Sequence, residues 1–196
     1  AAAAAAEDTA AAAAPKDAAE PSSKTRALLN YIGEMPADEK VVVFSQFTRY
    51  LDRLSVALGA SGVAHVVYKG SMNRAQRARA LSEFEHGAAT RVLLISLKAG
   101  GVGITLTRAN HVCLMDPWWN PAVEEQAVDR VYRLGQQRAV KVLRFVAGGT
   151  IEERIMDTHE DKRSMANLAL TRGRLDAASK AKQQAARMDR VRSLLS

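Results

Sequence analysis

The sequence predicts an α/β domain with a mainly parallel central sheet and helices on both of its faces. Short apolar runs alternate along the chain with longer segments in which apolar residues recur at helical spacing. The short runs are almost continuously apolar, which is typical of strands that are covered on both faces of a parallel sheet. A chain of 196 residues is long enough for one such domain and hardly for two.

The expected elements follow one another in a regular order after residue 21. Leu28, Leu29 and Ile32 form the apolar side of a helix that we expect over residues 22–35. Strands are expected at 41–44, 64–68, 92–95, 111–115 and 140–146, with a helix over 47–58 and further helices after Asn73, Asn120 and Thr150.

Two of these helices carry a side-chain signal at their start. Asn73 with Gln76, and Thr150 with Glu153, match the capping box, in which each side chain of the pair accepts a hydrogen bond from the backbone of the other. We expect the helix after Thr150 to run to about Met165.

The composition excludes a membrane-spanning protein and a cysteine-based metal site. No apolar run approaches the ~18 residues that a transmembrane helix needs. Cys113 is the single cysteine of the chain, so no internal disulfide can form, and we expect a buried, inert thiol. The histidines have no partners at metal-ligand spacing, and no metal site is expected.

The two ends of the chain differ in composition from its middle. The first 20 residues include 13 alanines, so we expect a linker over 1–21, a folded domain over 22–166 and a basic helical extension over 167–196. The chain resembles the C-terminal piece of something longer. Residues 161–196 carry nine basic and three acidic side chains of a protein whose net charge is +7. Nucleic acid would suit this charge as a partner, and a merely soluble basic helix suits it equally well.

The segment of residues 116–138 predicts a helix with two stripes. Asn120 suits the N-cap, Pro121 suits the first helical position, and Gly135 offers a stop. The apolar stripe, which would dock the helix on a core, consists of Val123, Ala127, Val131 and Leu134. The polar stripe consists of Gln126, Asp129, Arg130 and Arg133.

Arg130 and Arg133 are the candidate anion-binding residues of this helix. Two guanidinium groups one turn apart, beside the amide of Gln126, suit phosphate because they stay ionised and can bind oxygens in pairs. For the helix taken alone, a solvated face with a local Asp129–Arg133 pair is the alternative.

Polar loops follow four of the expected strands and should meet at one edge of the sheet. They lie at 45–46, 69–71, 96–103 and 116–120. The three glycines of the loop at 96–103 would let backbone amides approach a phosphate. A dinucleotide fingerprint would need a further glycine, and a tight turn without a ligand is the remaining alternative.

The segment that begins at Asp116 resembles the last helicase motif of the Swi/Snf-type ATPases, the DNA translocases of helicase superfamily 2. The family pattern Asp-x-x-Trp-Asn-Pro, then Gln-x-x-x-Arg-x-x-Arg-x-Gly-Gln, is matched by Asp116, Trp119, Asn120, Pro121, Gln126, Arg130, Arg133, Gly135 and Gln136. The double Trp and the pair Glu124-Glu125 are most similar to the branch that contains helicase-like transcription factor and its relatives in DNA-damage tolerance.

Two further segments resemble the same family. Residues 96–103 are similar to the motif Ser-x-x-Ala-Gly-Gly-x-Gly, which lines the cleft between the two lobes of these motors. Residues 69–77 are similar to Asp-Gly-Ser-x-x-x-x-x-Arg, although Lys69 stands where the family often has Asp. The resemblance covers about residues 24–166 and implies the second RecA-like lobe, with three layers of helices, sheet and helices.

The resemblance also implies roles for individual residues. Arg130 and Arg133 would act on ATP as arginine fingers, with Gln126 orienting their helix or the attacking water. The residues that would border the nucleotide are Gly101, Gly103 and Asp116. The residues that would grip the DNA backbone are Lys69, Gly70, Ser71, Lys98 and Trp119.

Half of an ATPase site is missing from the sequence. It contains no G-x-x-x-x-G-K-[ST] and no Asp-Glu-x-His strand end for magnesium, and we interpret Asp38-Glu39 as solvating a turn. We therefore expect ATP with Mg²⁺ to be held mainly by an N-terminal ATPase lobe of the same full-length protein, and the isolated chain to be inactive.

The implied function is ATP-driven translocation on double-stranded DNA, used in the nucleus to remodel chromatin or protein–DNA complexes or in DNA repair. Chromatin proteins are a further candidate partner, and no membrane is expected. The alternative is a DNA-binding or docking module without a motor. The paired arginines argue against that alternative, because a pure binder has no need of arginine fingers.

Overall fold

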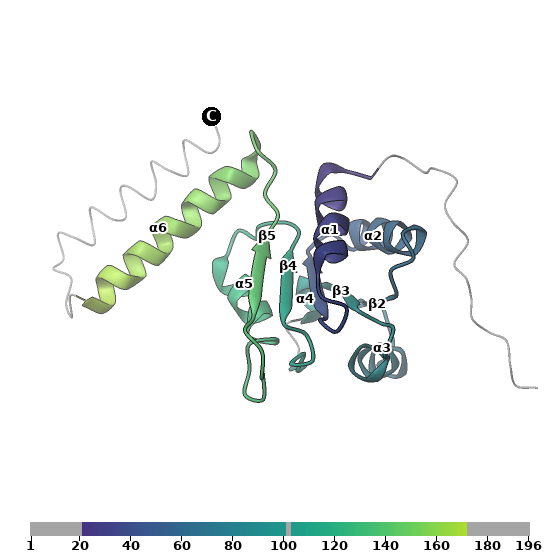
Figure 1. Ribbon diagram of the computed structural model, residues 1–196. Helices are drawn as coiled ribbons and strands as arrows, with labels where there is room; N and C mark the ends of the chain where they lie inside the picture. The colour runs from purple at the N-terminus through teal and green to yellow at the C-terminus, as the bar shows by residue number, and fades with distance from the viewer. Residues whose placement is uncertain (1–20, 101–102, 172–196) are drawn as a thin grey trace, which may run out of the picture.

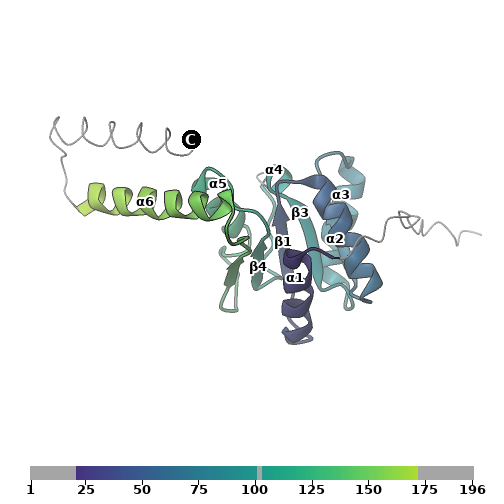
Figure 2. The ribbon, with the colours of Figure 1, turned by 90° about the horizontal axis from the view of Figure 1, so that it is seen from above.

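A single parallel sheet organises the computed structural model, which describes residues 21–100 and 103–171. Its strands lie in the order β2-β3-β1-β4-β5, and every neighbouring pair is parallel. Figure 1 labels the outer strands, and Figure 2 shows β1 between β3 and β4. The strands are β1 (Val41–Ser45), β2 (His65–Tyr68), β3 (Val92–Ser96), β4 (His111–Leu114) and β5 (Lys141–Arg144). The expected α/β class and all five strands are confirmed.

Helices cover both faces of this sheet. On one face, Leu28 of α1 (Ser23–Glu34) and Leu54 of α2 (Thr48–Ala60) pack on Val43 and its neighbours. The other face is covered by α3 (Arg74–His86), α4 (Leu97–Gly100) and α5 (Pro121–Val128), which contribute Phe84, Leu97 and Ala127 to the second core. The three strands β1, β3 and β4 are buried along their whole length because both of their faces are covered.

The last helix, α6 (Ile151–Thr171), extends away from the sheet on the side of β5 and α5 (Figures 1 and 2). It continues beyond the expected end at Met165. Among the described residues, no helix combines the length and the apolar character that crossing a bilayer requires. The expected linker and most of the basic extension lie outside the described residues.

One of the two expected capping boxes is present and the other is displaced. At α3, the Asn73 side chain accepts a hydrogen bond from the backbone N–H of Gln76. In return, the Gln76 side chain accepts one from the backbone N–H of Asn73. At α6, the Glu153 carboxylate accepts from the Gly149 amide at 3.1 Å rather than from that of Thr150. Gly149 has a φ of 69°, which turns the chain just before the helix and brings this N–H within reach of the carboxylate.

The helix expected to reach Gly135 ends seven residues earlier, at Val128. Its start is confirmed, because the Asn120 side chain accepts from the Ala122 amide at 3.2 Å. Beyond Val128 the chain makes a series of turns, so the two stripes of a single helix do not form. Leu134, expected on the docking stripe, is 100% exposed. Here the backbone N–H groups bond within successive turns, and the Arg130 carbonyl accepts from the Leu106 amide instead of continuing the helix.

Candidate functional site at the carboxyl edge of the sheet

The four polar loops expected at one edge follow β1, β2, β3 and β4, which run in the same direction. Three of them line a pocket of about 540 Å³. Four of the five predicted DNA-binding residues are part of its wall, namely Lys69, Gly70, Ser71 and Lys98. The other lining residues are Gln46, Thr48, Asp52, Arg77, Ser96 and Ala99. Trp119 is not among them.

The pocket is basic, although one of its cations is already paired. The Lys69 ammonium forms an ion pair with the carboxylate of Asp52, a residue that the sequence did not single out. Arg77 donates from Nη2 to the carbonyl of Gly70 at 2.5 Å, which fixes the loop before α3. Lys98 is exposed and has no ion-pair partner within the described residues. Its ammonium is therefore the cation of this pocket most available to an anion.

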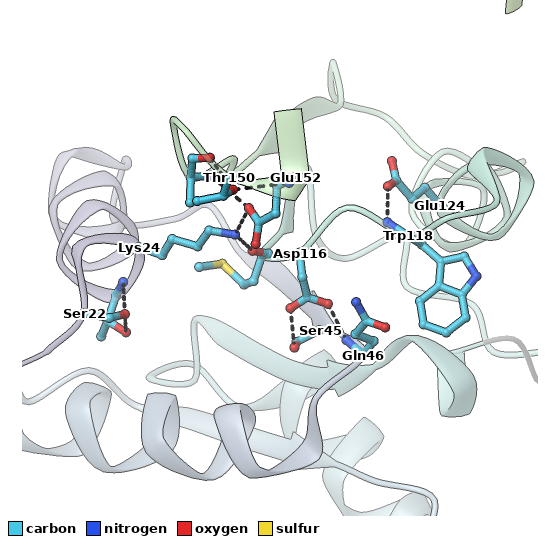
Figure 3. Close-up of polar contacts among 12 residues, drawn as sticks. Ser22, Lys24, Ser45, Gln46, Asp116, Trp118, Glu124, Thr150 and Glu152 are labelled. Atoms are coloured by element: carbon cyan, nitrogen blue, oxygen red, sulfur yellow. Dashed lines mark hydrogen bonds and ion pairs between the residues drawn. The ribbon is translucent and has the colours of Figure 1, made fainter. Parts of the chain in front are cut away.

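Asp116 joins the loops that follow β4 and β1. Its Oδ1 accepts from the Ser45 hydroxyl at 2.6 Å, and its Oδ2 accepts from the Gln46 amide at 2.7 Å (Figure 3). The residue is 5% exposed. Burial raises the pKa of the Asp116 carboxyl, while the hydrogen bonds from Ser45 and Gln46 oppose that shift. Both carboxylate oxygens are thus used to hold the edge together.

A second tie connects the end of β4 with the helices at both ends of the domain. The Lys24 ammonium donates to the Met115 carbonyl at 2.7 Å and to the Glu152 carboxylate at 2.5 Å (Figure 3). Glu152 also accepts from the Ala147 amide at 2.9 Å. Lys24 and Glu152 are 128 residues apart, and nothing in the sequence pattern indicated that they would meet.

The two tryptophans after β4 have different environments. Trp118 is partly buried and packs against the core, and its amide donates to Glu124 at 2.9 Å (Figure 3). Glu124 is fully buried, and its other oxygen accepts from Arg144 Nε at 2.8 Å. Trp119 is 52% exposed. The loop therefore anchors one indole and presents the other to solvent.

The two predicted arginine fingers lie in the turns that follow α5. Arg130 is partly buried, and its Nε has no hydrogen-bond partner among the described residues. Arg133 is exposed and donates from Nη1 to the Thr105 hydroxyl at 3.4 Å. Gln126 is exposed on α5. The arginines are thus separated from Gln126 by the end of the helix, and the Asp129–Arg133 pair of the alternative interpretation is not among the ion pairs of the described residues.

The turn segment lies directly against the chain that follows the glycine-rich loop. The Leu106 amide donates to the Arg130 carbonyl at 2.8 Å. The side-chain Nε2 of Gln136 donates to the backbone carbonyls of Ala109 at 2.6 Å, Thr107 at 3.1 Å and Val131 at 3.3 Å. Gly103 is exposed at the end of that loop, with a φ of 32°, whereas Gly101 lies outside the described residues. The structure thus brings Gly103 and the arginine segment to neighbouring loops.

The acidic residues of the site are engaged inside the chain rather than arranged for a metal. The described part of the chain contains no group of three or more His, Cys, Asp and Glu residues that could hold a metal ion. Asp38 and Glu39, interpreted from the sequence as solvating a turn, lie at the opposite edge of the sheet, where Asp38 forms an ion pair with Arg138 and Glu39 is hydrogen-bonded to His111.

Comparison with known proteins agrees with this geometry. The family model of the helicase conserved C-terminal domain matches residues 23–135, more than half of the chain. This chain belongs to that family. The match begins with α1 and ends at Gly135, so it includes the pocket, the Trp118-Trp119 loop and both arginines.

The relatives of this helicase C-terminal domain include DNA repair proteins. It is 47% identical over 158 residues to the DNA repair protein RAD5 of Cryptococcus neoformans, a match that covers 78% of this chain and 13% of that protein. It is 46% identical over 151 residues to the DNA repair protein RAD5A of Arabidopsis thaliana, covering 76% of this chain and 15% of that protein. The helicase domain described here therefore corresponds to a small part of each relative.

The fold also has a solved counterpart. The crystal structure of the C-terminal part of the Fun30 ATPase domain matches this helicase domain with a TM-score of 0.66 and 33% identity, covering 68% of this chain and 44% of that one. The expected RecA-like lobe is confirmed by this match. Together with the repair relatives, it confirms the resemblance to the Swi/Snf-type ATPases.

Proposed function

We propose that this domain is the second lobe of an ATP-dependent translocase on double-stranded DNA, which works in the nucleus in DNA repair or in the remodelling of chromatin and protein–DNA complexes. The observation that carries the proposal is the pocket that unites Lys69, Gly70, Ser71 and Lys98 at the carboxyl edge of the sheet. The names of the repair relatives support the choice of process.

The pocket suits the sugar–phosphate backbone of DNA. Gly70 and Ser71 lie just before Asn73, the N-cap of α3, where the helix dipole favours an anion. Lys98 adds an exposed ammonium from α4, which follows β3. These groups contact phosphate and not base edges, so the grip would be independent of DNA sequence and would weaken as salt is raised.

The arginine segment suits the phosphates of ATP. The Nε of Arg130 has no partner and Arg133 makes one long hydrogen bond, so the charge of neither is neutralised within the described residues. ATP with Mg²⁺ would be held mainly by an N-terminal ATPase lobe of the same full-length protein. In the reaction, the γ-phosphoryl group of ATP is transferred to water and ADP is released. Arginine fingers supplied across such an interface accelerate hydrolysis by ~10³ to 10⁵.

The nucleotide-bordering role expected of Asp116 would then be indirect. Its carboxylate holds Ser45 and Gln46, so we propose that it shapes the edge facing the nucleotide and does not itself contact the phosphates. Gly103, at the exposed end of the glycine-rich loop, remains a candidate for close approach to the nucleotide. Gln126 would act from α5, through water or the position of the turns that follow.

The DNA grip is tested by titrating duplex DNA into the purified chain at several salt concentrations. We expect weak binding that falls steeply with salt. Lys98→Ala should weaken binding to unrelated DNA sequences by about the same factor. It should also make the slope of log affinity against log salt concentration shallower by about 0.9. Lys141→Ala is the matched control, because Lys141 is exposed at the start of β5, at the opposite edge. Affinity that is insensitive to salt, or a strong preference for one sequence, would exclude a backbone grip.

A DNA-binding module without a motor would show the same titration, so the arginines must be tested separately. In such a module, replacing Arg130 or Arg133 could change only DNA binding, because there would be no ATP turnover to lose. The unpartnered Nε of Arg130 favours the motor, since leaving a buried donor unpaired carries a cost that a bound phosphate would remove.

A further inference from the structure

The loop that carries Trp119 is held from outside the sheet by α6. His159 is fully buried, and its Nε2 donates to the Trp118 carbonyl at 2.6 Å. Lys162, almost one turn further along α6, donates to the Trp119 carbonyl at 3.2 Å. The Lys162 ammonium also lies over the Trp119 indole, 5.9 Å from the ring centroid. One helix face thus contacts both residues of the tryptophan loop.

The hydrogen bonding of His159 indicates why a histidine is present. A carbonyl oxygen can only accept, so Nε2 carries the proton. Nδ1 is buried and has no partner within the described residues. Burying an unpaired polar atom is unfavourable, and an apolar side chain would avoid that cost only by leaving the Trp118 carbonyl without its donor. What the histidine supplies is the hydrogen bond that fixes the Trp118 carbonyl.

Lys162 and Trp119 together form a pair of groups that suits nucleic acid. A half-exposed indole can pack on a sugar or a base. A lysine ammonium has three donors, of which the Trp119 carbonyl uses one. The others remain able to reach a phosphate oxygen beside the indole. The contact with the ring holds the ammonium at this place.

We propose that Lys162 is a further DNA-contacting residue and that His159 is a positioning residue for Trp119, so that the grip on DNA depends on how α6 sits against the tryptophan loop. The proposal rests on the proposed function, because it takes Trp119 to meet DNA. It adds a second contact point, apart from the basic pocket, in which α6 and the loop after β4 act as one unit.

The experiment uses the 196-residue chain with Trp118→Phe, which leaves Trp119 as the single indole because the chain has two tryptophans. Duplex DNA is titrated at several salt concentrations while Trp119 emission is followed. We expect DNA to change that emission. Lys162→Ala should weaken binding by about threefold or more, from the lost phosphate contact and cation–π pair, and should make the salt slope shallower by about 0.9.

Arg154→Ala is the matched control for Lys162. Arg154 is exposed on the same helix and carries the same charge, but it has no contact with the tryptophan loop. We expect it to leave Trp119 emission unchanged and to change the salt slope less than Lys162→Ala does. Equal slopes for the two variants would show that only general charge matters and would overturn the role of Lys162.

His159 is tested by His159→Phe, which fills the buried space without a donor, and by His159→Gln, which restores an N–H. His159→Phe should shift Trp119 emission to the red and weaken DNA binding without changing the salt slope, because no charge is lost. His159→Gln should restore both. His159 is not a positioning residue if His159→Phe shows the same Trp119 emission and DNA affinity as the Trp118→Phe chain. It is also not one if neither variant shows a cooperative thermal unfolding transition. If the parent chain binds no DNA at all, the proposed function itself fails.

Discussion

Buried carboxylates determine the local geometry of the site at the level of single residues. Asp116 and Glu124 lie on either side of the Trp118-Trp119 loop, and each uses both oxygens for hydrogen bonds inside the chain. The sequence marked Asp116 as a motif residue but could not show its partners, because Ser45 is 71 positions away. These hydrogen bonds support the proposal that Asp116 shapes the site without itself contacting the nucleotide.

Arg130 and Arg133 give the sharpest prediction at this scale. Replacing either with Ala in the full-length protein should lower DNA-stimulated ATP hydrolysis by roughly 10²-fold or more, the scale of a lost arginine finger. DNA affinity and melting temperature should change far less, because the side chains make no strong contact within the described residues. Arg→Lys should fail as well, since a point charge does not reproduce the planar guanidinium. A variant that retains full turnover would remove that arginine from the site.

Glu39 provides a prediction on pH. The hydrogen bond with His111 is the main cause that lowers the pKa of the Glu39 carboxyl from its ordinary 4.5. A carboxyl with a lowered pKa stabilises the fold above its ordinary pKa, and this stabilisation is lost as the pH falls through the lowered value. The loss of unfolding free energy in Glu39→Gln should thus be present at pH 4.5 and shrink as the pH falls below it. Glu34→Gln, which removes an exposed acid of α1, is the control. A difference that grows on acidification would contradict the assignment.

At the level of elements, the sequence predicted the strands well because burial on both faces leaves a continuous apolar run, as in Val41 to Phe44. It predicted the start of α5 because Asn120 acts locally. It failed at the end of α5 because the helical spacing of side chains continues through Leu134, whereas the backbone there is bound by Gln136 and Leu106. One of these hydrogen bonds comes from another loop, at Leu106, and the other from the Gln136 side chain, and neither leaves a periodic signal.

The strand-exit rule located most of the site for a similar reason. Parallel strands end at one edge, so the loops after β2 and β3 had to meet, and four predicted DNA-binding residues share one pocket. Asp52 was missed because it lies on a helix face, where an acid is ordinarily solvated. The contacts of His159 and Lys162 were missed because nothing local places α6 beside the tryptophan loop.

Gln136 allows the turn segment to be tested as an element. Gln136→Ala removes the donor shared by three carbonyls, and we expect the unfolding free energy to fall by about 1–3 kcal/mol, the cost of leaving buried groups unpaired. Turnover in the full-length protein should fall too, since the segment carries both arginines. Gln137→Ala, at an exposed neighbouring position, should do neither. Equal effects of the two substitutions would show that Gln136 does not hold the segment.

At the level of the whole molecule, the purified chain by itself should not hydrolyse ATP. The sequence contains no phosphate-cradling G-x-x-x-x-G-K-[ST] segment, and the described residues contain no carboxylate cluster for Mg²⁺. The measurement is phosphate release with and without duplex DNA, with an Arg130→Ala chain prepared in parallel. DNA-stimulated release that Arg130→Ala abolishes would mean that the chain holds a complete site.

The strand order β2-β3-β1-β4-β5 also determines how the chain can fold while it is being synthesised. β1 pairs with β3 and β4, and β2 pairs with β3, so the first two strands have no strand partner until Val92 to Ser96 has been made. Until then the apolar run Val41 to Phe44 lacks the backbone hydrogen bonds to its neighbouring strands. Such a run is prone to pair with other chains. Because β3 pairs with both β1 and β2, we expect these two pairings to form only after β3 has emerged from the ribosome.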